Sequence, residues 1–280
     1  MLENRPVLVI AVTSGKGGVG KTNVSINLAV GLAISGKSVM LMDADLGLAN
    51  IDIMLGIKPK LNLHQVITGE CSLEEVIIEG PLGISIVPAA SGIGRMADLS
   101  VMEQGNLIRA FGEIHHQIDV LIVDTAAGIS NSVISFSKAA QEIIVVVCDE
   151  PASITDAYAL IKVLNREHGV GRFQILSSMV KDVEHGKKLF AKLIRTTEIY
   201  LDVSMGYLGS IPMDEKLKDA IRIQSAVMQS FPYCASSIAF QRLTKKVLDF
   251  PVLPSTTGYL EFFIERIARN ENAIAIAGTC

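Results

Sequence analysis

The sequence predicts a doubly wound α/β fold, in which a mostly parallel β-sheet carries helices on both faces. Short apolar, β-branched runs alternate with helix-like segments along the chain, and this alternation is typical of βαβ units. Runs such as Val-Leu-Ile-Val at 120–123 and Ile-Ile-Val-Val-Val at 143–147 are apolar throughout, as a parallel sheet covered on both faces requires. The expected strands are Val7–Val12, Ser38–Asp43, Ile84–Pro88, Asp119–Asp124, Ile143–Cys148, Phe173–Ser177 and Gly206–Ile211.

Composition favours a compact body that acts on proteins. Of the 280 residues 49% are apolar and 19% are charged, which is ample for a sizeable core. The net charge is −4 and the basic residues are scattered, so direct DNA binding is not expected. The four cysteines have no metal-ligand spacing, which argues against a metal cluster and against a disulfide scaffold. We therefore expect a cytoplasmic protein.

The chain divides by composition into a body and a tail. No apolar run approaches the roughly 18 residues that span a bilayer, so a membrane-integral protein is not expected. The segment Phe250-Pro-Val-Leu-Pro-Ser-Thr-Thr-Gly258 is the only compositional break. We expect one domain over residues 1–250 and a tail over 251–280.

A glycine-rich loop follows the first expected strand and opens a helix near Thr22. Glycines let backbone N–H groups converge on phosphate oxygens, and the helix adds the positive end of its dipole. Lys21 of such a loop reaches the β- and γ-phosphates, and the Thr22 hydroxyl can ligate Mg²⁺. The expected phosphate-binding residues are Gly15, Lys16, Gly17, Gly18, Val19, Gly20, Lys21, Thr22 and Asn23.

The loop carries a second lysine, Lys16, at a position that the ordinary phosphate loop leaves free. The string Lys-Gly-Gly-Val-Gly-Lys-Thr resembles the deviant Walker A motif of the MinD/ParA family of ATPases. In that family the first lysine reaches across a dimer interface to the nucleotide of the partner. The resemblance therefore implies ATP as ligand, a homodimer that forms with ATP, and catalytic roles for Lys16 and Lys21.

Acidic residues follow the second and fourth long strands, where ligands of such sheets bind. The segment from Asp43 to Asp52 resembles the family's switch I, with Asp45 matching the residue that positions the attacking water and Asp43 assisting near Mg²⁺. Asp124 ends an apolar strand, as in a Walker B element that reaches Mg²⁺ directly or through water. The expected metal-side residues are thus Thr22, Asp43 and Asp124. No covalent nucleophile is needed, because water attacks in line while Mg²⁺ and the lysines neutralise charge.

Three further segments complete the resemblance. Gly128 matches the switch II glycine, whose N–H can bond the γ-phosphate. Ser178, Pro212 and Asp214 lie in segments that resemble those flanking the adenine. Many relatives carry Asn at the place of Ser178, and a serine can bond only one base edge group at a time, so the choice between adenine and guanine stays open.

The segment at the start of the helix expected near Pro151 resembles one branch of the family in particular. The sequence predicts Ser153 as its N-cap, although Cys-Asp-Glu-Pro-Ala-Ser-Ile-Thr-Asp-Ala-Tyr-Ala is also similar to the flagellar number regulators, FleN/FlhG, within the MinD branch. The strings Asp-Leu-Gly-Leu-Ala-Asn at 45–50, Val-Pro-Ala-Ala-Ser-Gly at 87–92 and Asp-Thr-Ala-Ala-Gly at 124–128 agree, so the resemblance covers about 7–268. It implies a switch that restrains the AAA+ flagellar transcription activator FleQ.

The FlhF GTPase is a partner of some family members, and its place here stays open. Those members carry an N-terminal activator segment with an Asp-Gln-Ala core. Six residues precede the first expected strand of this sequence, and none forms that motif.

The tail contains an amphipathic segment at about 258–269. Leu260, Phe263, Ile264, Ile267 and Ala268 fall on one helical face. MinD-like proteins often bind the bilayer through such a helix, which implies a peripheral place at the inner membrane or the cell pole. The four charges of this segment cancel, however, whereas a basic face would add attraction to anionic lipid. A helix docked on its own domain is the equal alternative.

Other functions on the same fold are less consistent with the sequence. A MinD/ParA-type positioning ATPase that acts at the membrane or on DNA is the main alternative, although DNA partitioning needs a basic surface. A metal-cluster carrier requires paired cysteines near switch II, and residues 124–135 contain none. An arsenite-pump ATPase usually has two phosphate loops, and this chain has one.

Overall fold

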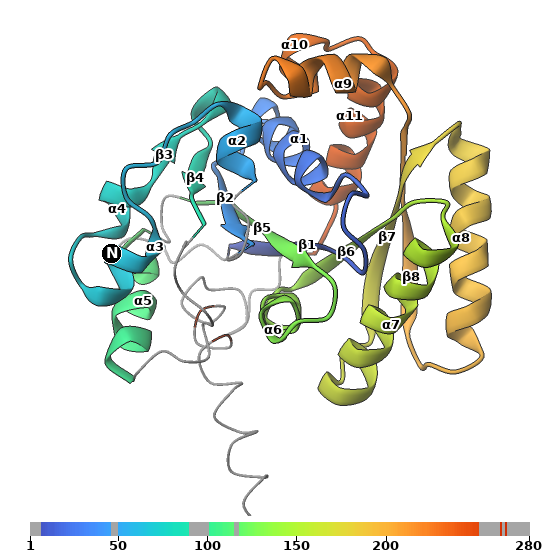
Figure 1. Cartoon of the computed structure of the whole chain (residues 1–280), viewed down its shortest axis with the longest axis horizontal. Helices are drawn as coiled ribbons and strands as arrows, with labels where there is room; N and C mark the ends of the chain where they lie inside the picture. Colours follow the sequence, from blue (N-terminus) through green and yellow to red (C-terminus); the bar gives the residue numbers. More distant parts are fainter. Residues whose placement is uncertain are drawn as a thin grey trace, which may run out of the picture.

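The computed structural model describes residues 7–45, 50–89, 101–114, 118–251, 264 and 267. Within them an eight-stranded sheet runs in the order β3-β4-β2-β5-β1-β6-β7-β8 (Figure 1). Every neighbouring pair is parallel except β3 and β4, which are antiparallel. The strands are β1 (Leu8–Ser14), β2 (Val39–Ala44), β3 (Ile78–Glu79), β4 (Ser85–Val87), β5 (Val120–Ala127), β6 (Glu142–Val147), β7 (Arg172–Val180) and β8 (Ser204–Pro212).

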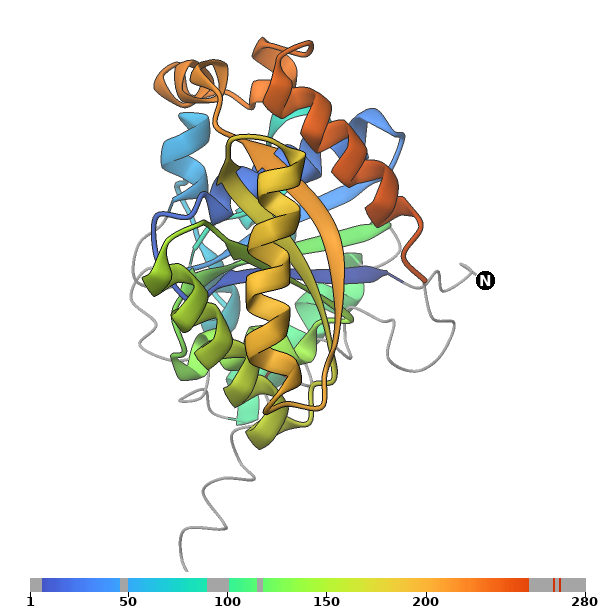
Figure 2. The same ribbon diagram turned by 90° about the vertical axis from the view of Figure 1, so that its right-hand side faces the viewer.

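Helices cover both faces of this sheet, which confirms the predicted fold class (Figures 1 and 2). One face carries α1, α9, α10 and α11, and α3 to α8 lie on the other. The helices are α1 (Lys21–Ile34), α2 (Ile51–Leu55), α3 (Leu63–Thr68), α4 (Leu73–Val76), α5 (Val101–Ile114), α6 (Asn131–Ala139), α7 (Pro151–His168), α8 (Val183–Glu198), α9 (Glu215–Arg222), α10 (Val227–Ser230) and α11 (Ala235–Leu248), with a 3₁₀ turn at Pro81–Gly83.

The seven strands expected from the apolar runs are all present, with ends that move by up to three residues. Strand β3 was not predicted, because two residues are too few to form an apolar run. The predicted N-cap of α7, Ser153, is wrong. Glu150 occupies the cap position and Ser153 lies inside the first turn, where its hydroxyl accepts a hydrogen bond from the N–H of Cys148 at 3.1 Å.

Alternate side chains of the central strand β1 pack against the helices on the two faces of the sheet. Leu8, Ile10 and Val12 of β1 pack under α1 and α11, whereas Val9 and Ala11 face α5 and α6. All seven residues of β1 are buried. Near-continuous hydrophobicity is therefore required in this strand, because both of its faces are covered.

The order of the strands places a ligand crevice at the end of β1. β2 lies on one side of β1, beyond β5, and the chain crosses to the other side at β6. Ligands of open α/β sheets bind outside the carboxyl ends of strands at such a reversal. The loop from β1 to α1 lies at this point (Figure 1).

Two residues of the tail are described, and both belong to the core. Ile264 and Ile267 are helical and 0% and 2% exposed, and they join the apolar cluster that contains Val9 and Phe111. The other residues of the predicted amphipathic face lie outside the described residues. No helix among the described residues is long and apolar enough to cross a membrane.

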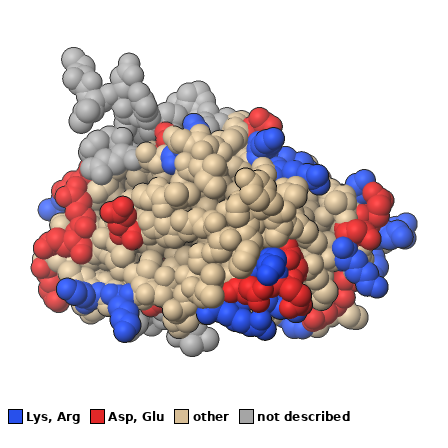
Figure 3. All heavy atoms as spheres, turned by 90° about the horizontal axis from the view of Figure 1, so that it is seen from above, with Lys and Arg blue, Asp and Glu red and all other residues tan. Residues whose placement is uncertain are grey.

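Charge is dispersed on the face drawn in Figure 3. Lys and Arg atoms lie beside Asp and Glu atoms towards the periphery, and most of the centre carries neither. This face, which includes the side of α9 to α11 seen from above, therefore has no continuous basic field for nucleic acid.

Candidate functional site: a phosphate loop with two lysines

The phosphate loop ends on a helix N-terminus that is open to a ligand. Gly20 occupies the N-cap position of α1 with φ +88°, and no side chain among the described residues caps this helix. The first N–H groups of a helix have no intrahelical partner and attract anions. The start of α1 thus provides the donors that a phosphate group requires.

The other loop residues have different tasks. A Cβ atom on Gly17 or Gly18 would meet nothing within 4 Å, so these positions leave room for a ligand. At Gly15 a Cβ would lie 2.2 Å from the backbone carbon of Asp156 in α7, so glycine is needed there for contact with this helix. Val19 is 1% exposed and packs in the core, so the predicted contribution of Val19 is confined to its backbone.

Three donors converge on the buried carboxylate of Asp124 in strand β5. Lys21 Nζ lies 2.9 Å from Oδ1, and the hydroxyls of Thr22 and Ser25 donate at 2.7 Å to Oδ2 and Oδ1. Asp124 is 0% exposed and Lys21 is 8% exposed. A buried carboxylate must be compensated by such donors. The structure thus brings together Lys21, Thr22 and Asp124, as the sequence predicts.

Asp43 is the second buried carboxylate of the site. It pairs in register with Asp124 on the neighbouring strand and accepts hydrogen bonds from the N–H groups of Asp45, Asn50 and Ile51 at 3.0–3.2 Å. Burial raises the pKa of Asp43 to about 6, and the nearby charge of Asp124 also raises it. The three hydrogen bonds act in the opposite direction and lower the pKa. Two adjacent carboxylates favour a cation between them.

This donor set fits a hard cation. Mg²⁺ prefers one or two carboxylates together with oxygen atoms of phosphates and hydroxyls. Thr22 is hydrogen-bonded to Asp124, and Asp43 lies opposite Asp124 on the neighbouring strand, so the three offer such oxygen atoms in one cluster. These are the residues that would hold the ion.

Asp45 lies just beyond β2, next to this cluster. Its Oδ2 is 3.4 Å from the side-chain amide of Asn50, and its backbone N–H donates to Asp43. Residues 46–49 lie outside the described residues. The role of Asp45 in positioning water therefore stays a prediction, and the structure places the residue beside the carboxylates.

The two lysines of the loop have opposite environments. Lys21 is buried against Asp124, whereas the side chain of Lys16 is 37% exposed and forms an ion pair with Glu150 at the start of α7. The hydrogen bond and charge of Glu150 raise the pKa of Lys16. An exposed ion pair of this kind is weak and can be exchanged.

The N–H of Gly128 is hydrogen-bonded within the protein in this conformation. Gly128 has φ +100°, and its N–H donates to the carbonyl of Ser14 at 2.9 Å. The predicted bond of this N–H to a γ-phosphate requires that the link to Ser14 be broken. The same Ser14 donates from its hydroxyl to the carbonyl of Lys16 at 2.9 Å, so it joins the phosphate loop to switch II.

The residues predicted to flank the base share one cavity. Ser178, Pro212 and Asp214 line a cavity of about 120 Å³ beside Gly20, together with Asn23 from the predicted phosphate-binding residues. The strand β7 ends here with an irregular register between 178 and 180. Binding of a base in this cavity stays a prediction.

Asp214 has a structural task that the sequence analysis did not foresee. One oxygen caps α9 by accepting from the N–H of Lys216 at 2.9 Å, and the other accepts from the N–H and hydroxyl of Ser236 at 2.9 Å. Burial raises the pKa of Asp214, but these hydrogen bonds outweigh it and the pKa is lowered. Its carboxylate joins α9 to α11, and the base-binding role of Asp214 stays a prediction.

Three residues of the site were missed. Ser25 lies one turn after Lys21, and this spacing is a usable signal. Met179 adopts φ +56° at the end of β7 and lines the base cavity, but a local sequence pattern cannot indicate its conformation. Glu150 contacts Lys16 from 134 residues away, so only the fold brings the pair together.

Comparison with known proteins agrees with this geometry. The model of the ParA family, described as NUBPL iron-transfer P-loop NTPase, matches residues 7–248. The chain belongs to the MinD/ParA family of P-loop ATPases, as the sequence analysis predicted.

Within this family the chain resembles flagellar regulators. It is 54% identical over 265 residues to the antiactivator FleN of Pseudomonas aeruginosa, a match that covers 95% of both chains. It is 33% identical to the flagellum site-determining protein YlxH of Helicobacter pylori, over 90% of this chain and 84% of that protein.

Solved structures of MinD proteins share the fold. MinD in the MinC:MinD complex of Aquifex aeolicus is 25% identical with a TM-score of 0.69, covering 89% of this chain and 98% of that one. The Mg-ADP complex of MinD from Pyrococcus horikoshii has a TM-score of 0.68 at 24% identity, covering 87% and 96%.

The description of the family model mentions iron transfer, so the positions of the described cysteines are of interest. Cys71, Cys148 and Cys234 are free and dispersed. Within the described part of the chain no three His, Cys, Asp or Glu side chains form a metal-holding group.

Proposed function

We propose that this protein is an ATP-dependent dimerising switch that regulates flagellar number by antagonising an AAA+ flagellar transcription activator of the FleQ type. The observation that carries the proposal is the division of labour between the two lysines. Lys21 is buried against Asp124, whereas Lys16 is partly exposed and, among the described residues, forms an ion pair with Glu150. A surface cation beside the phosphate loop is available to a second molecule.

The chemistry of the switch follows from the site. The N-terminus of α1 and Lys21 bind the phosphates, and Asp45 orients the attacking water at the end of β2. Thr22, Asp43 and Asp124 would hold Mg²⁺, which would neutralise charge on the phosphates. Lys16 of one subunit adds positive charge at the nucleotide of the other, so hydrolysis requires the dimer.

Dimerisation links nucleotide state to surface shape. Lys16 leaves Glu150 when it reaches the other subunit, and Glu150 begins α7, the helix that packs against Gly15. Gly128 exchanges Ser14 for a γ-phosphate in the same transition. The two changes would alter the exposed surface around α7 only while ATP is bound, and a partner could read that surface.

The named relatives support the flagellar part. The antiactivator FleN shares 54% identity over nearly the whole chain, and YlxH is a flagellum site-determining protein. We infer that the partner is the transcription activator whose action an antiactivator opposes. The FlhF GTPase is a second candidate partner.

Capture of partners by a locked bait tests this proposal. Asp45→Ala protein with ATP serves as the dimeric bait, and Lys21→Ala protein, which has lost its phosphate-binding lysine, serves as the control. We expect an AAA+ flagellar activator on the Asp45→Ala bait only, identified by mass spectrometry and then confirmed with the purified activator. Enrichment of DNA or cell-division proteins instead would overturn the flagellar role and leave the ATPase assignment intact.

The tail helix adds a proposed second target of the switch, a membrane surface. Ile264 and Ile267 are buried in the core of this structure, which supports a docked helix in the monomer. We propose that dimerisation with ATP releases the helix, so that its apolar face binds the inner membrane or the cell pole. Co-sedimentation with anionic vesicles tests this point: pelleting is expected with ATP but not with ADP, and no pelleting in either state would contradict it.

A further inference from the structure

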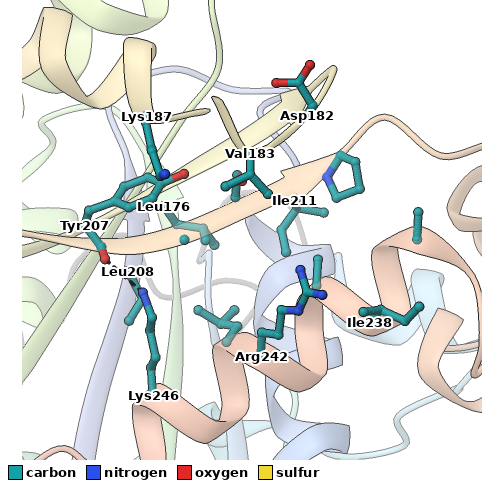
Figure 4. Close-up of a pocket in the computed structure, with 16 residues that line it drawn as sticks. Leu176, Asp182, Val183, Lys187, Tyr207, Leu208, Ile211, Ile238, Arg242 and Lys246 are labelled. Atoms are coloured by element: carbon teal, nitrogen blue, oxygen red, sulfur yellow. Dashed lines mark hydrogen bonds between the residues drawn. The ribbon is translucent and has the colours of Figure 1, made fainter. Parts of the chain in front are cut away.

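A cavity lies along the free edge of the sheet, beyond the base cavity. It has a volume of about 560 Å³ and lies between α8 and α11 over strand β8 (Figure 4). Figure 2 faces this side and shows β8 between the two helices. β8 is the last strand of the sheet, so none of the described strands pairs with its outer side.

The cavity follows the strand instead of one face of the sheet. All six residues from 207 to 212 line it. The register of β8 against β7 shifts between Tyr207 and Gly209, and beyond this shift successive side chains of the strand point to opposite faces. A hollow that touches all six residues therefore runs along the length of the strand. At about 3.3 Å per residue, this edge is about 20 Å long, which is the length of a short extended peptide.

One position of the edge admits the backbone of another chain. A Cβ atom placed on Gly209 would meet nothing within 4 Å. Glycine within a strand often marks the close approach of another backbone. In addition, the phenol oxygen of Tyr207 is buried and has no hydrogen-bond partner among the described residues.

The walls of the groove are apolar and its rim is positively charged. Leu208, Ile211 and Ile238 are among the apolar residues that line it. Three cations, Lys187, Arg242 and Lys246, oppose a single acidic residue, Asp182. This local excess of positive charge contrasts with the net charge of −4 of the whole chain.

The three cations differ in the partners that they contact within the protein. Lys187 pairs with Glu184, and Lys246 donates to the outward carbonyl of Tyr207 at 3.2 Å. Arg242 forms no ion pair within the described part of the chain, and its guanidinium points from α11 towards β8 (Figure 4). Arg242 is therefore the cation most available to a ligand.

We propose that this groove, lined by residues 207–212 and flanked by α8 and α11, binds an extended acidic segment of a partner protein. The segment adds its backbone along β8, places apolar side chains between the helices, and directs flanking Asp or Glu residues to Arg242 and Lys187. The proposal does not rest on the flagellar role. Ile211 and Pro212 line both this groove and the base cavity, so the docked segment lies next to the nucleotide.

A defined peptide tests the proposal with the full chain. The probe is a fluorescein-labelled peptide with blocked ends, in which a Leu-Val-Ile-Leu centre is flanked by glutamates. Fluorescence anisotropy measures its affinity, and hydrogen–deuterium exchange locates it. We expect saturable binding that slows exchange within residues 204–212, and weaker binding of a peptide whose glutamates are replaced by lysines.

Charge reversal at the rim provides the decisive variants. Arg242→Glu should weaken the glutamate-flanked peptide roughly tenfold and favour the lysine-flanked one, because a rim charge now repels the ligand. Lys245→Glu is the matched control, since Lys245 is exposed on the same helix and does not line the groove. It should leave the affinity within about twofold of wild type.

Several outcomes would overturn the proposal. These are no saturable binding of the glutamate-flanked peptide, equal affinity for the two peptides, slowed exchange only outside β8, and equal effects of Arg242→Glu and Lys245→Glu. Binding of dodecanoate in place of the peptide would assign the groove to a small amphipathic acid. Slowed exchange in β8 that follows self-association would assign it to a second copy of this chain.

Discussion

The ionised carboxylate of Asp43 lowers the free energy of unfolding of the nucleotide-free protein at neutral pH. Its carboxylate is 2% exposed and lies beside Asp124, and burial raises its pKa to about 6. The folded protein therefore binds a proton more tightly here than the unfolded chain does. The stability that this proton provides is lost as the pH rises from about 4 through 6.

We therefore predict that Asp43→Asn removes a pH dependence of folding. A shift from 3.8 to about 6 corresponds to about 3 kcal/mol between pH 4 and pH 7. Over this range the free energy of unfolding of wild type should fall by this amount relative to the variant. Urea unfolding in EDTA without nucleotide measures it, and parallel pH profiles of the two proteins would refute the burial argument.

Asp45 offers a second test at the residue scale. Asp45→Ala should retain ATP binding and dimerisation and lose most hydrolysis, by roughly 10²-fold or more, since general-base and water-positioning groups contribute about that much. Phosphate release under single-turnover conditions measures it. Asp52→Ala is the control, because Asp52 lies in the same region and bonds the N–H of Ile53. Wild-type turnover of Asp45→Ala would remove the proposed role.

Local spacing predicts part of this site and misses the rest for a physical reason. Lys21, Thr22 and Asp124 follow from a glycine-rich loop and from an apolar strand that ends in an acid, and the structure joins them by hydrogen bonds. The pairing of Lys16 with Glu150 depends on α7 meeting the loop. The capping by Asp214 likewise depends on two helices that meet in space.

At the scale of elements, the tail helix is held by apolar contacts. Ile264 and Ile267 pack in the cluster that contains Val9, Met40 and Phe111. The sequence predicts the amphipathic face but cannot decide between a bilayer and the core as its partner, because both are apolar. Burial of two isoleucines favours the core in this conformation.

We predict that Ile267→Ala destabilises the nucleotide-free protein. Removal of a buried isoleucine side chain typically costs about 2–5 kcal/mol, including the cavity that it leaves. Ile199→Ala is the matched control, because Ile199 is 70% exposed, and it should change stability by less than about 0.5 kcal/mol. Urea denaturation compares the two. Equal effects would mean that the tail is not docked in solution.

The strands that are long and buried could be predicted from the sequence, and the short strand at the edge of the sheet could not. Seven strands follow from apolar runs because a parallel sheet covered by helices admits few polar residues. The two residues of β3 pair with β4 at the edge of the sheet, where pairing depends on a neighbour instead of on hydrophobicity. The N-cap of α7 was wrong because Pro151 at the first helical position fixes the start two residues before Ser153.

At the scale of the whole molecule, the residues proposed to bind the nucleotide gather near the carboxyl ends of the strands. Lys16 lies in the loop after β1 and Lys21 begins α1, whereas Asp45 follows β2 and Asp124 lies within β5. The edge strand β8 adds the base cavity on one side and the proposed docking groove on the other. Nucleotide state and partner binding therefore meet on adjoining surfaces.

The central claim is that Lys16 acts on a second subunit. The measurement that tests it most directly is the mass in solution, by light scattering, of Asp45→Ala and of Lys16→Ala/Asp45→Ala, each with ATP and with ADP. We predict the mass of two chains for Asp45→Ala with ATP alone. The double variant should bind ATP through Lys21 and keep the mass of one chain. A dimer of the double variant with ATP would contradict the account.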